Sequence, residues 1–299
     1  MRVRRRCVQW TVLVGLGLGQ VGLLGQNLAD LERQAARGDA DAEFRLGAEF
    51  AAGRNGPADM AQALEWYRRA AAGGNVNAMY NLGVAYRNGL GVKRDDAEAA
   101  RWYQRAAEQG HPEARFALGV ACATGRGVKQ DRGKAVYWFR KAEERTANAL
   151  TEVYLGEMYT NAEGVAKDDS EAMRWYGKAA EQGNVVAEYR LANGYLMGTG
   201  LKPDAAQAAA WFRKAAQQGA SPAQYQLGVM YESGEGVEQS YAQAYYWLAL
   251  AVHSEPDTRA QEQIAVRRDD AATHLAPDVV VATEERVKEW KGQGLGTRD

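Results

Sequence analysis

The stretch "LGVAYRNGLGVKRDDAEAARWY", residues 82–103, decides the fold, because nearly the same spacing occurs six times in the 299-residue chain. Its fixed marks are a Leu-Gly pair, an aromatic residue, two glycines around Leu90, an Asp and a Trp-Tyr pair. A spacing that recurs with a period of roughly 20 to 50 residues indicates a repeat protein, so the period is established before any local motif is interpreted.

Two sets of residues at equivalent positions in successive repeats, here called columns, define the period. The tryptophans of the repeat stand 36, 36, 37, 36 and 36 residues apart, at Trp66, Trp102, Trp138, Trp175, Trp211 and Trp247. The leucines run in parallel at Leu46, Leu82, Leu118, Leu155, Leu191 and Leu227. Because six of the eight tryptophans belong to one column, the regularity is not a chance spacing.

The residues around each leucine predict the first of two helices in every repeat. An aromatic residue usually stands four positions after the leucine, as Tyr86 does, which places both on one helical face. The residue directly after the leucine is Gly in five copies and Ala192 in the fifth. Because glycine inside a helix costs about 1 kcal/mol relative to alanine, we interpret it as the point where a neighbouring helix approaches closely. The pair Gly89 and Gly91 is typical of a helix end followed by a tight turn.

The residues before each tryptophan predict the start of the second helix. Seven positions before it stands a side chain whose oxygen can accept an unpaired N–H of the first turn, which is the role of a helix N-cap. These residues are Asp59, Asp95, Asp131, Asp168, Asp204 and Ser240. Alanines three positions before and four positions after each tryptophan give the small surface that closely packed helices need. One such helix pair cannot bury its apolar face alone, whereas stacked pairs can.

The combined pattern, from the Leu-Gly pair through the Gly-x-Gly turn and the Asp cap to the Trp-Tyr pair, resembles the Sel1-like repeat family, relatives of the tetratricopeptide repeat. The similarity covers residues 40–253. It implies an all-α fold, a right-handed α-solenoid of about six helix-turn-helix repeats, and usually a scaffold that binds proteins. We expect a capping helix within residues 27–39, the repeats over 40–255, capping helices within 256–291 and a flexible tail over 292–299.

The third repeat departs from the pattern. Its second helix ends in "KAEERTANAL", residues 141–150, which lacks the stop glycine and is one residue longer than its counterparts. Cys122 also replaces the aromatic residue of its column. One interpretation is drift with local repacking, since a free cysteine usually behaves as a small buried apolar residue. The other is a bend that changes the curvature between the third and fourth repeats.

The N-terminus predicts export. Four arginines within residues 2–6 precede an apolar run over residues 8–24, which is the build of a signal peptide occupying residues 1–26. The protein would then be periplasmic or secreted. Alternatively, the run over residues 8–24 stays in place as an inner-membrane anchor, because its length is near the lower limit for a membrane span. The glycines of residues 17–22 fit a dinucleotide-binding string, but they lack the strand-to-helix context that this motif requires.

Composition excludes several classes of function. The formal net charge is −1, which argues against a nucleic-acid partner, since such proteins carry a clustered basic face. Two cysteines, Cys7 and Cys122, give no disulfide framework. Three scattered histidines have no metal-ligand spacing, and a phosphate-loop-like string at residues 127–134 is followed by Ala135 instead of the required hydroxyl residue. We therefore predict a non-enzymatic protein without cofactor or metal.

Two alternatives to a simple exported scaffold stay open. A hydrolase acting on cell-wall or antibiotic substrates would need paired carboxylates or a nucleophile in one cleft, whereas the Asp column is explained by capping. A membrane-anchored assembly factor would retain residues 8–24.

The remaining candidate is a binding surface on the first helices, which line the concave face of superhelical helix-pair stacks. The residue before each leucine varies, and so does the residue four positions further on. From these two columns we predict partner-binding residues at Tyr154, Met158, Arg190, Arg45, Asn81, Gln226 and Met230, because Tyr, Arg and Met favour interface contacts. Tyr154, Met158 and Arg190 are the expected anchors for a protein or peptide partner. The alternative is that these columns are ordinary solvated or packed positions.

Overall fold

The computed structural model describes residues 28–54 and 56–290, which form fifteen helices and no strand. A first helix, α1 (Leu28–Ala36), precedes six helix pairs. The pairs are α2 (Ala40–Ala52) with α3 (Met60–Ala72), α4 (Val76–Asn88) with α5 (Asp96–Glu108), α6 (Pro112–Thr124) with α7 (Arg132–Glu143), α8 (Ala149–Thr160) with α9 (Asp169–Glu181), α10 (Val185–Met197) with α11 (Ala205–Gln217), and α12 (Ser221–Ser233) with α13 (Tyr241–Ser254). Two more helices follow, α14 (Thr258–Ala272) and α15 (Pro277–Glu289).

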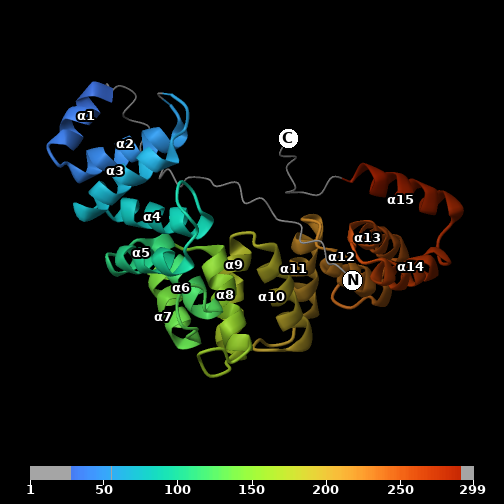
Figure 1. Cartoon of the computed structure of the whole chain (residues 1–299). Coiled ribbons are helices and arrows are strands. Elements are labelled where there is room, and N and C mark those ends of the chain that lie inside the picture. The colour runs from blue at the N-terminus through green and yellow to red at the C-terminus, as the bar shows by residue number, and fades with distance from the viewer. Residues whose placement is uncertain (1–27, 55, 291–299) are drawn as a thin grey trace.

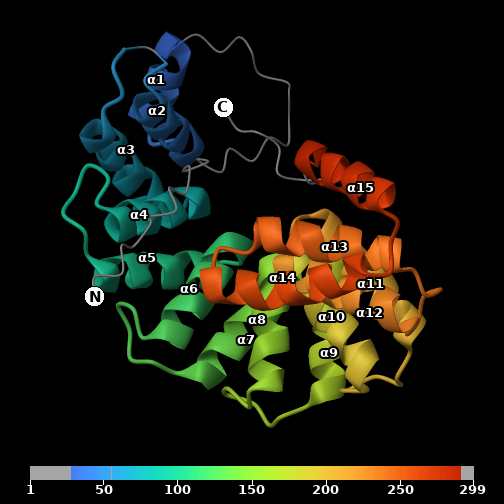
Figure 2. The ribbon, with the colours of Figure 1, turned by 90° about the vertical axis from the view of Figure 1, so that its right-hand side faces the viewer.

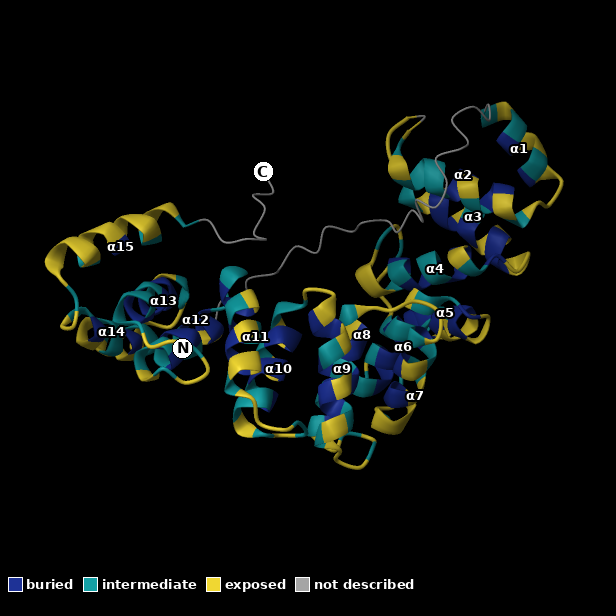
Figure 3. Cartoon of the chain, turned by 180° about the vertical axis from the view of Figure 1, so that it is seen from behind, coloured by how far each residue is buried: buried dark blue, intermediate teal, exposed yellow. Residues whose placement is uncertain are grey.

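The helix pairs follow one another along a curved path, and each helix packs mainly on its neighbours in the sequence (Figure 1). The first and last helices, α1 and α15, lie toward the same side of the arc (Figures 1 and 2). Buried residues concentrate where helices touch, while α15 exposes most of its surface (Figure 3). The predicted all-α solenoid is therefore confirmed. The predicted signal or anchor segment, residues 1–26, and the predicted tail, residues 292–299, lie outside the described residues.

The second helices start where the sequence predicts. Each of the six N-cap side chains accepts a hydrogen bond from a backbone N–H of the first turn. Asp131, for example, accepts from the Lys134 amide at 2.9 Å. Because the side-chain oxygen accepts a hydrogen bond from its own helix, the Asp residues of this column stabilise the start of the second helix.

The two glycines of the turn have different roles. The first, such as Gly89, ends the first helix in the left-handed conformation, with φ of +72°. The second lies against the start of the preceding repeat's second helix: a Cβ added at Gly127 would lie 1.9 Å from the Asp96 carbonyl oxygen. The same close approach recurs at Gly164, where the nearest atoms belong to the Arg132 backbone. The second glycine therefore sets the packing between repeats, a role beyond the predicted helix stop.

Within each pair, the glycine after the repeat leucine lies beneath the residue that follows the tryptophan. A Cβ added at Gly83 would lie 2.6 Å from Cδ1 and Cε1 of Tyr103. The same contact joins Gly47 to Tyr67, Gly119 to Phe139, Gly156 to Tyr176 and Gly228 to Leu248. In the fifth repeat Ala192 belongs to the same buried cluster as Phe212. The predicted close approach of two helices is confirmed, and the side chain that meets the glycine is the residue after the tryptophan, an aromatic ring in the first four repeats and Leu248 in the sixth.

Five of the repeat tryptophans lie half-buried on the second helices, and the sixth, Trp247, is buried. In four repeats a cationic side chain three residues later lies over the indole ring, with distances to the ring centroid of 3.6 to 4.9 Å. These pairs are Arg69 with Trp66, Arg105 with Trp102, Lys178 with Trp175 and Lys214 with Trp211. Such cation–π contacts cover the ring without burying the charge.

The glycine contact predicts that Gly83→Ala destabilises the chain. The added methyl group meets the Tyr103 ring at 2.6 Å, so the ring or the helix must shift, at a cost of roughly 1–3 kcal/mol. Chemical denaturation of both proteins measures the difference.

Gly177→Ala is the matched control, because Gly177 lies inside α9 with open space around it. We expect this variant to be stabilised by up to about 1 kcal/mol, since alanine is the better helix former. Equal effects of the two substitutions would contradict the proposed close contact.

Candidate partner-binding face

The first helix of every pair carries a strip of half-buried side chains at equivalent positions. The strip is centred on the residues two before and two after each repeat leucine, which are partly accessible in all six repeats. These residues are Phe44, Ala48, Tyr80, Val84, Phe116, Val120, Val153, Glu157, Tyr189, Asn193, Tyr225 and Val229. We call the solvent-facing side of the first helices around this strip the first-helix face.

The structure divides the seven predicted partner-binding residues into two groups. Arg45 and Arg190 are exposed on the first-helix face, and Asn81, Tyr154 and Gln226 are half-buried there. Met158 and Met230 are instead buried, with 3% and 1% of their surface exposed. The prediction that these two methionines face a partner was therefore wrong.

The two methionines are buried because side chains at their position point toward another helix and away from solvent. Residues three after the repeat leucine point into the preceding repeat's second helix: a Cβ added at Gly194, the counterpart of Met158 and Met230, would lie 2.5 Å from Met173 Sδ. The spacing of four residues correctly put the two predicted columns on neighbouring positions of one helix. The sequence did not show that one column faces solvent and the other the preceding helix pair.

Tyr154 is accessible only in part, because its ring belongs to an internal aromatic cluster. It stacks on Phe139 with ring centroids 5.2 Å apart and an interplanar angle of 15°, and it contacts Phe116 at 5.9 Å. This ring therefore contributes to the packing of the third repeat against the fourth.

Two other predicted residues interact with tyrosines that cover the glycines. Burial raises the pKa of the Tyr67 hydroxyl, and a side-chain hydrogen bond with Asn81 partly offsets this. Burial likewise raises the pKa of Tyr176, while the nearby positive charge of Arg190 acts in the opposite direction. The residues directly before the repeat leucines, such as Asn81 and Arg190, thus lie beside tyrosine hydroxyls at the junctions between repeats.

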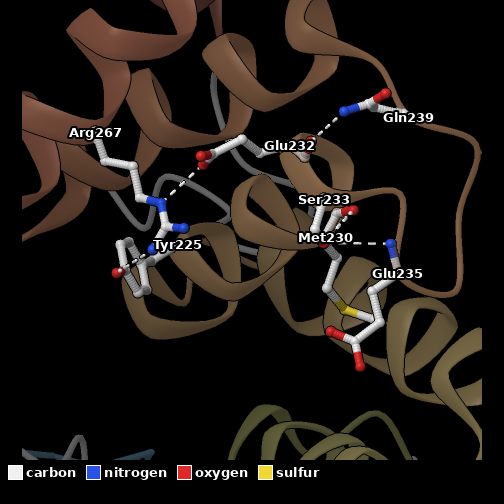
Figure 4. Close-up of polar contacts among 7 residues, drawn as sticks. All are labelled: Tyr225, Met230, Glu232, Ser233, Glu235, Gln239 and Arg267. Atoms are coloured by element: carbon white, nitrogen blue, oxygen red, sulfur yellow. Dashed lines mark hydrogen bonds and ion pairs between the residues drawn. The ribbon is translucent and has the colours of Figure 1, made fainter.

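The sixth repeat uses part of its first-helix face to attach α14. Arg267 of α14 donates to Glu232 at 2.7 Å and to the Tyr225 hydroxyl at 3.3 Å, as Figure 4 shows. Gln239 donates to the Glu232 carbonyl at 2.8 Å and holds the following turn (Figure 4). Tyr225 and Glu232 of this face are therefore engaged by α14.

An acid pair lies at the irregular junction between the third and fourth repeats, and the sequence reading missed it. The position five residues after the tryptophan is a buried alanine in the first, second, fourth and fifth repeats, at Ala71, Ala107, Ala180 and Ala216, but Glu143 in the third. Comparing the residues five positions after each tryptophan would have revealed Glu143 from the sequence.

Glu143 shares a side-chain hydrogen bond with Glu152, which is 2% exposed. Burial, and then the Glu152 carboxylate, raise the pKa of Glu143 to about 7. Burial also raises the pKa of Glu152, which accepts a hydrogen bond of 2.5 Å from Gln182. Glu143 accepts from the Asn148 amide at 3.2 Å. Both carboxyls are thus bonded to groups of the junction itself.

Other kinds of site find little support in residues 28–54 and 56–290. No group of three or more His, Cys, Asp or Glu side chains in these ranges could hold a metal ion. No helix among them is long and apolar enough to cross a membrane.

The comparisons with known proteins agree with the repeat pattern. The Sel1 repeat model matches residues 40–75, 76–111, 112–145, 150–184, 185–219 and 221–253. A protective antigen of uropathogenic Escherichia coli with an SLR fold is 35% identical over 89% of this chain, with a TM-score of 0.76. This chain covers only 56% of that antigen's length. A Sel1 repeat protein of Oxalobacter formigenes is 29% identical, with a TM-score of 0.67, over 76% of this chain and 93% of that protein. A comparison with curated proteins finds no match.

The acid pair predicts a pH-dependent stability. Because the pKa of Glu143 is raised in the folded chain, its proton is lost more readily on unfolding. The free energy of unfolding should therefore fall as the pH rises from the carboxyl's ordinary pKa to about 7. Glu143→Gln should remove this fall, which we expect to be on the order of 2 kcal/mol between about pH 5 and about pH 8. Urea denaturation at both pH values measures it.

Glu144→Gln is the control for this experiment. Glu144 is exposed and pairs with Lys141 at 2.6 Å, so its substitution should leave the fall in place. If the wild-type chain is equally stable at both pH values, the shared hydrogen bond is not formed in solution.

Proposed function

The chain belongs to the Sel1 repeat family, and from this premise we propose that it is a non-enzymatic exported scaffold. It binds a protein or peptide partner along the first-helix face, which we assign to the concave side of the solenoid. Repeat solenoids use such extended concave surfaces for recognition.

The observation that carries this proposal is the contrast between constant and variable columns. The core columns hold the same residue types in nearly every repeat, so the backbone spacing is regular. The column before the leucine holds Arg45, Asn81, Ala117, Tyr154, Arg190 and Gln226. Regular spacing with changing side chains suits the recognition of an extended partner, one repeat after another.

Apolar residues exposed on the fourth and fifth repeats support the same proposal. Leu150 and Val186 are 44% and 45% exposed at the starts of α8 and α10, and Met197 is 71% exposed at the end of α10. Large apolar side chains that are exposed on a proposed binding face are candidates for contacts with a partner.

Export is supported by the basic and apolar character of residues 1–26. The similar E. coli protein is a protective antigen, which fits a location outside the cytoplasm. A membrane-anchored assembly factor is the alternative if residues 8–24 are retained.

We expect the triple variant Leu150→Ser, Val186→Ser, Arg190→Ala to weaken partner capture at least about tenfold, because interface energy concentrates in a few contacts. The partner is first identified by crosslinking in the native cell and mass spectrometry, and its affinity is then measured with purified proteins. All three side chains are exposed, so the folded fraction should not change.

The matched control is Arg101→Ala, Gln104→Ala, Glu108→Ala on the exposed side of α5. Loss of capture with this variant and not with the first would place the partner on the second helices and overturn the proposal.

Sequencing the N-terminus of the mature protein tests export. We expect a new N-terminus near Gly25, at the end of the apolar run. A mature chain that begins at Met1 and fractionates with the inner membrane would favour the anchored assembly factor.

A further inference from the structure

The third repeat brings two arginine side chains to one place on the surface. Arg115 of α6 and Arg145, in the turn after α7, both lie over Gly110. A Cβ added at Gly110 would be 3.6 Å from Arg115 Nη2, 3.8 Å from Arg145 Cζ and 3.9 Å from Arg145 Nη2. Arg115 is half-buried and Arg145 is exposed. Because like charges repel, packing within the chain does not explain why the two guanidinium groups converge.

Other repeats show what the same two positions do when one of them is acidic. One position is three residues before the repeat leucine, and the other is seven residues after the tryptophan. In the fourth repeat Gln182 donates to the Glu152 carboxylate at 2.5 Å, and in the fifth Gln218 donates to the Glu188 carboxylate at 2.8 Å. These repeats therefore join an N–H donor to a carboxylate of their own.

The third repeat has donors at both positions and no acceptor. Arg115 replaces the glutamate and Arg145 replaces the glutamine. No other repeat carries a cation at either position, since the remaining pairs are Glu43 with Gly73, Met79 with Gln109 and Gln224 with Ser254. The carboxylate that completes the pair in the fourth and fifth repeats is thus absent from the third.

Backbone carbonyls hold Arg115 in position. Its Nε donates to the Ala107 carbonyl at 3.2 Å, and its Nη1 donates to the Lys141 carbonyl at 2.7 Å. These carbonyls belong to the last turns of α5 and α7, where helix carbonyls have no partner further along their own helix. Arg115 Nη2 takes part in neither bond and is the atom nearest to the Cβ position over Gly110. One guanidinium group is thus already oriented, with an N–H group left for a ligand.

The acidic side chains next to the two arginines in the sequence already have partners. They are Glu113 with His111 at 3.1 Å, Glu144 with Lys141 at 2.6 Å, and Glu143 with Glu152 through their shared hydrogen bond. In the described part of the chain, no carboxylate lies within 4.0 Å of either guanidinium group. Two guanidinium groups that converge without a counter-ion favour a carboxylate ligand, which accepts their N–H groups in pairs.

We propose that Arg115 and Arg145 together bind the carboxylate of an acidic residue, Asp or Glu, of the partner. This carboxylate plays the part that Glu152 and Glu188 play in the fourth and fifth repeats, and it accepts from Arg115 Nη2 and from the Arg145 guanidinium. The inference rests on the proposed function, since it assigns one residue of the partner to one place on the scaffold. Charge complementarity selects an acidic segment over a neutral or basic one.

The arginine pair lies close to a side chain already assigned to the interface. The exposed Leu150 is five residues from Arg145, so the two lie at most about 18 Å apart. An extended partner segment of about six residues therefore spans both, with its acidic residue on the arginines and an apolar residue on Leu150.

The test uses a blocked pentapeptide, acetyl-Ala-Ala-Glu-Ala-Ala-amide, and its counterpart with Gln in place of Glu. The Gly110 amide and the Arg115 Nε–H signals of the purified chain are followed by NMR during titration at low salt. We expect the Glu peptide to shift both signals saturably and the Gln peptide to bind at least about tenfold more weakly. Added salt should weaken the binding of the Glu peptide. Unshifted signals, or equal affinities for the two peptides, would overturn the proposal.

Three variants locate the binding. Arg145→Gln should weaken binding of the Glu peptide at least about fivefold, and its folded fraction should not change, because Arg145 is exposed. Arg126→Gln is the matched control, since Arg126 is also exposed and has no carboxylate within 4.0 Å in the described residues. Arg115→Glu places a carboxylate beside Arg145, as in the fourth and fifth repeats, and should abolish peptide binding. Undiminished binding by Arg145→Gln, or an equal loss with Arg126→Gln, would overturn the proposal.

The failure of this inference is distinguishable from that of the proposed function. If the crosslinked partner binds Arg145→Gln normally but is lost in the variant of Leu150, Val186 and Arg190, the scaffold stands and the acidic contact does not. If no partner is captured by the wild-type chain, the scaffold itself is refuted, whatever the peptide does.

Discussion

The structure depends on one contact that is repeated along the chain: in the first four repeats an aromatic ring of the second helix lies directly on a glycine of the first, and in the sixth Leu248 takes the place of the ring. At Gly83 the Tyr103 ring occupies the place that any side chain would need. The contact fixes the separation of the two helices and the rotation of each about its axis. The repeat leucine and the alanines around the tryptophan are buried as a consequence. A glycine that is unfavourable in an isolated helix is thus favourable in the pair.

The second glycine of the turn fixes how one helix pair packs against the preceding pair. Gly127 lies against the backbone at the start of α5, and from the second repeat onward each turn contacts the preceding repeat where a side chain would clash. Between these fixed points, the residues on facing helices vary in size, from Ala100 with Ala121 to Met173 with Gly194.

The junction between the third and fourth repeats shows the opposite case. Glu143 introduces a carboxyl where the other junctions bury alanine, and it meets the nearly inaccessible Glu152. Burial and, after it, the neighbouring Glu152 carboxylate both favour the protonated form of Glu143, and for this reason its pKa is raised. The same repeat lacks the stop glycine, so the irregularity recognised in its sequence coincides with an unusual interface.

The sequence by itself determined the helices, their caps and the period, because these follow from local spacing: an Asp at the N-cap, a Gly at the helix end and apolar residues on one helical face. It also identified Arg45 and Arg190 as accessible positions. Only the tertiary structure decided which neighbouring column faces solvent, and it buried Met158 and Met230. It likewise brought Glu143 to Glu152. These outcomes depend on how one helix pair is rotated against the next, and that rotation is set by contacts between residues about one repeat apart.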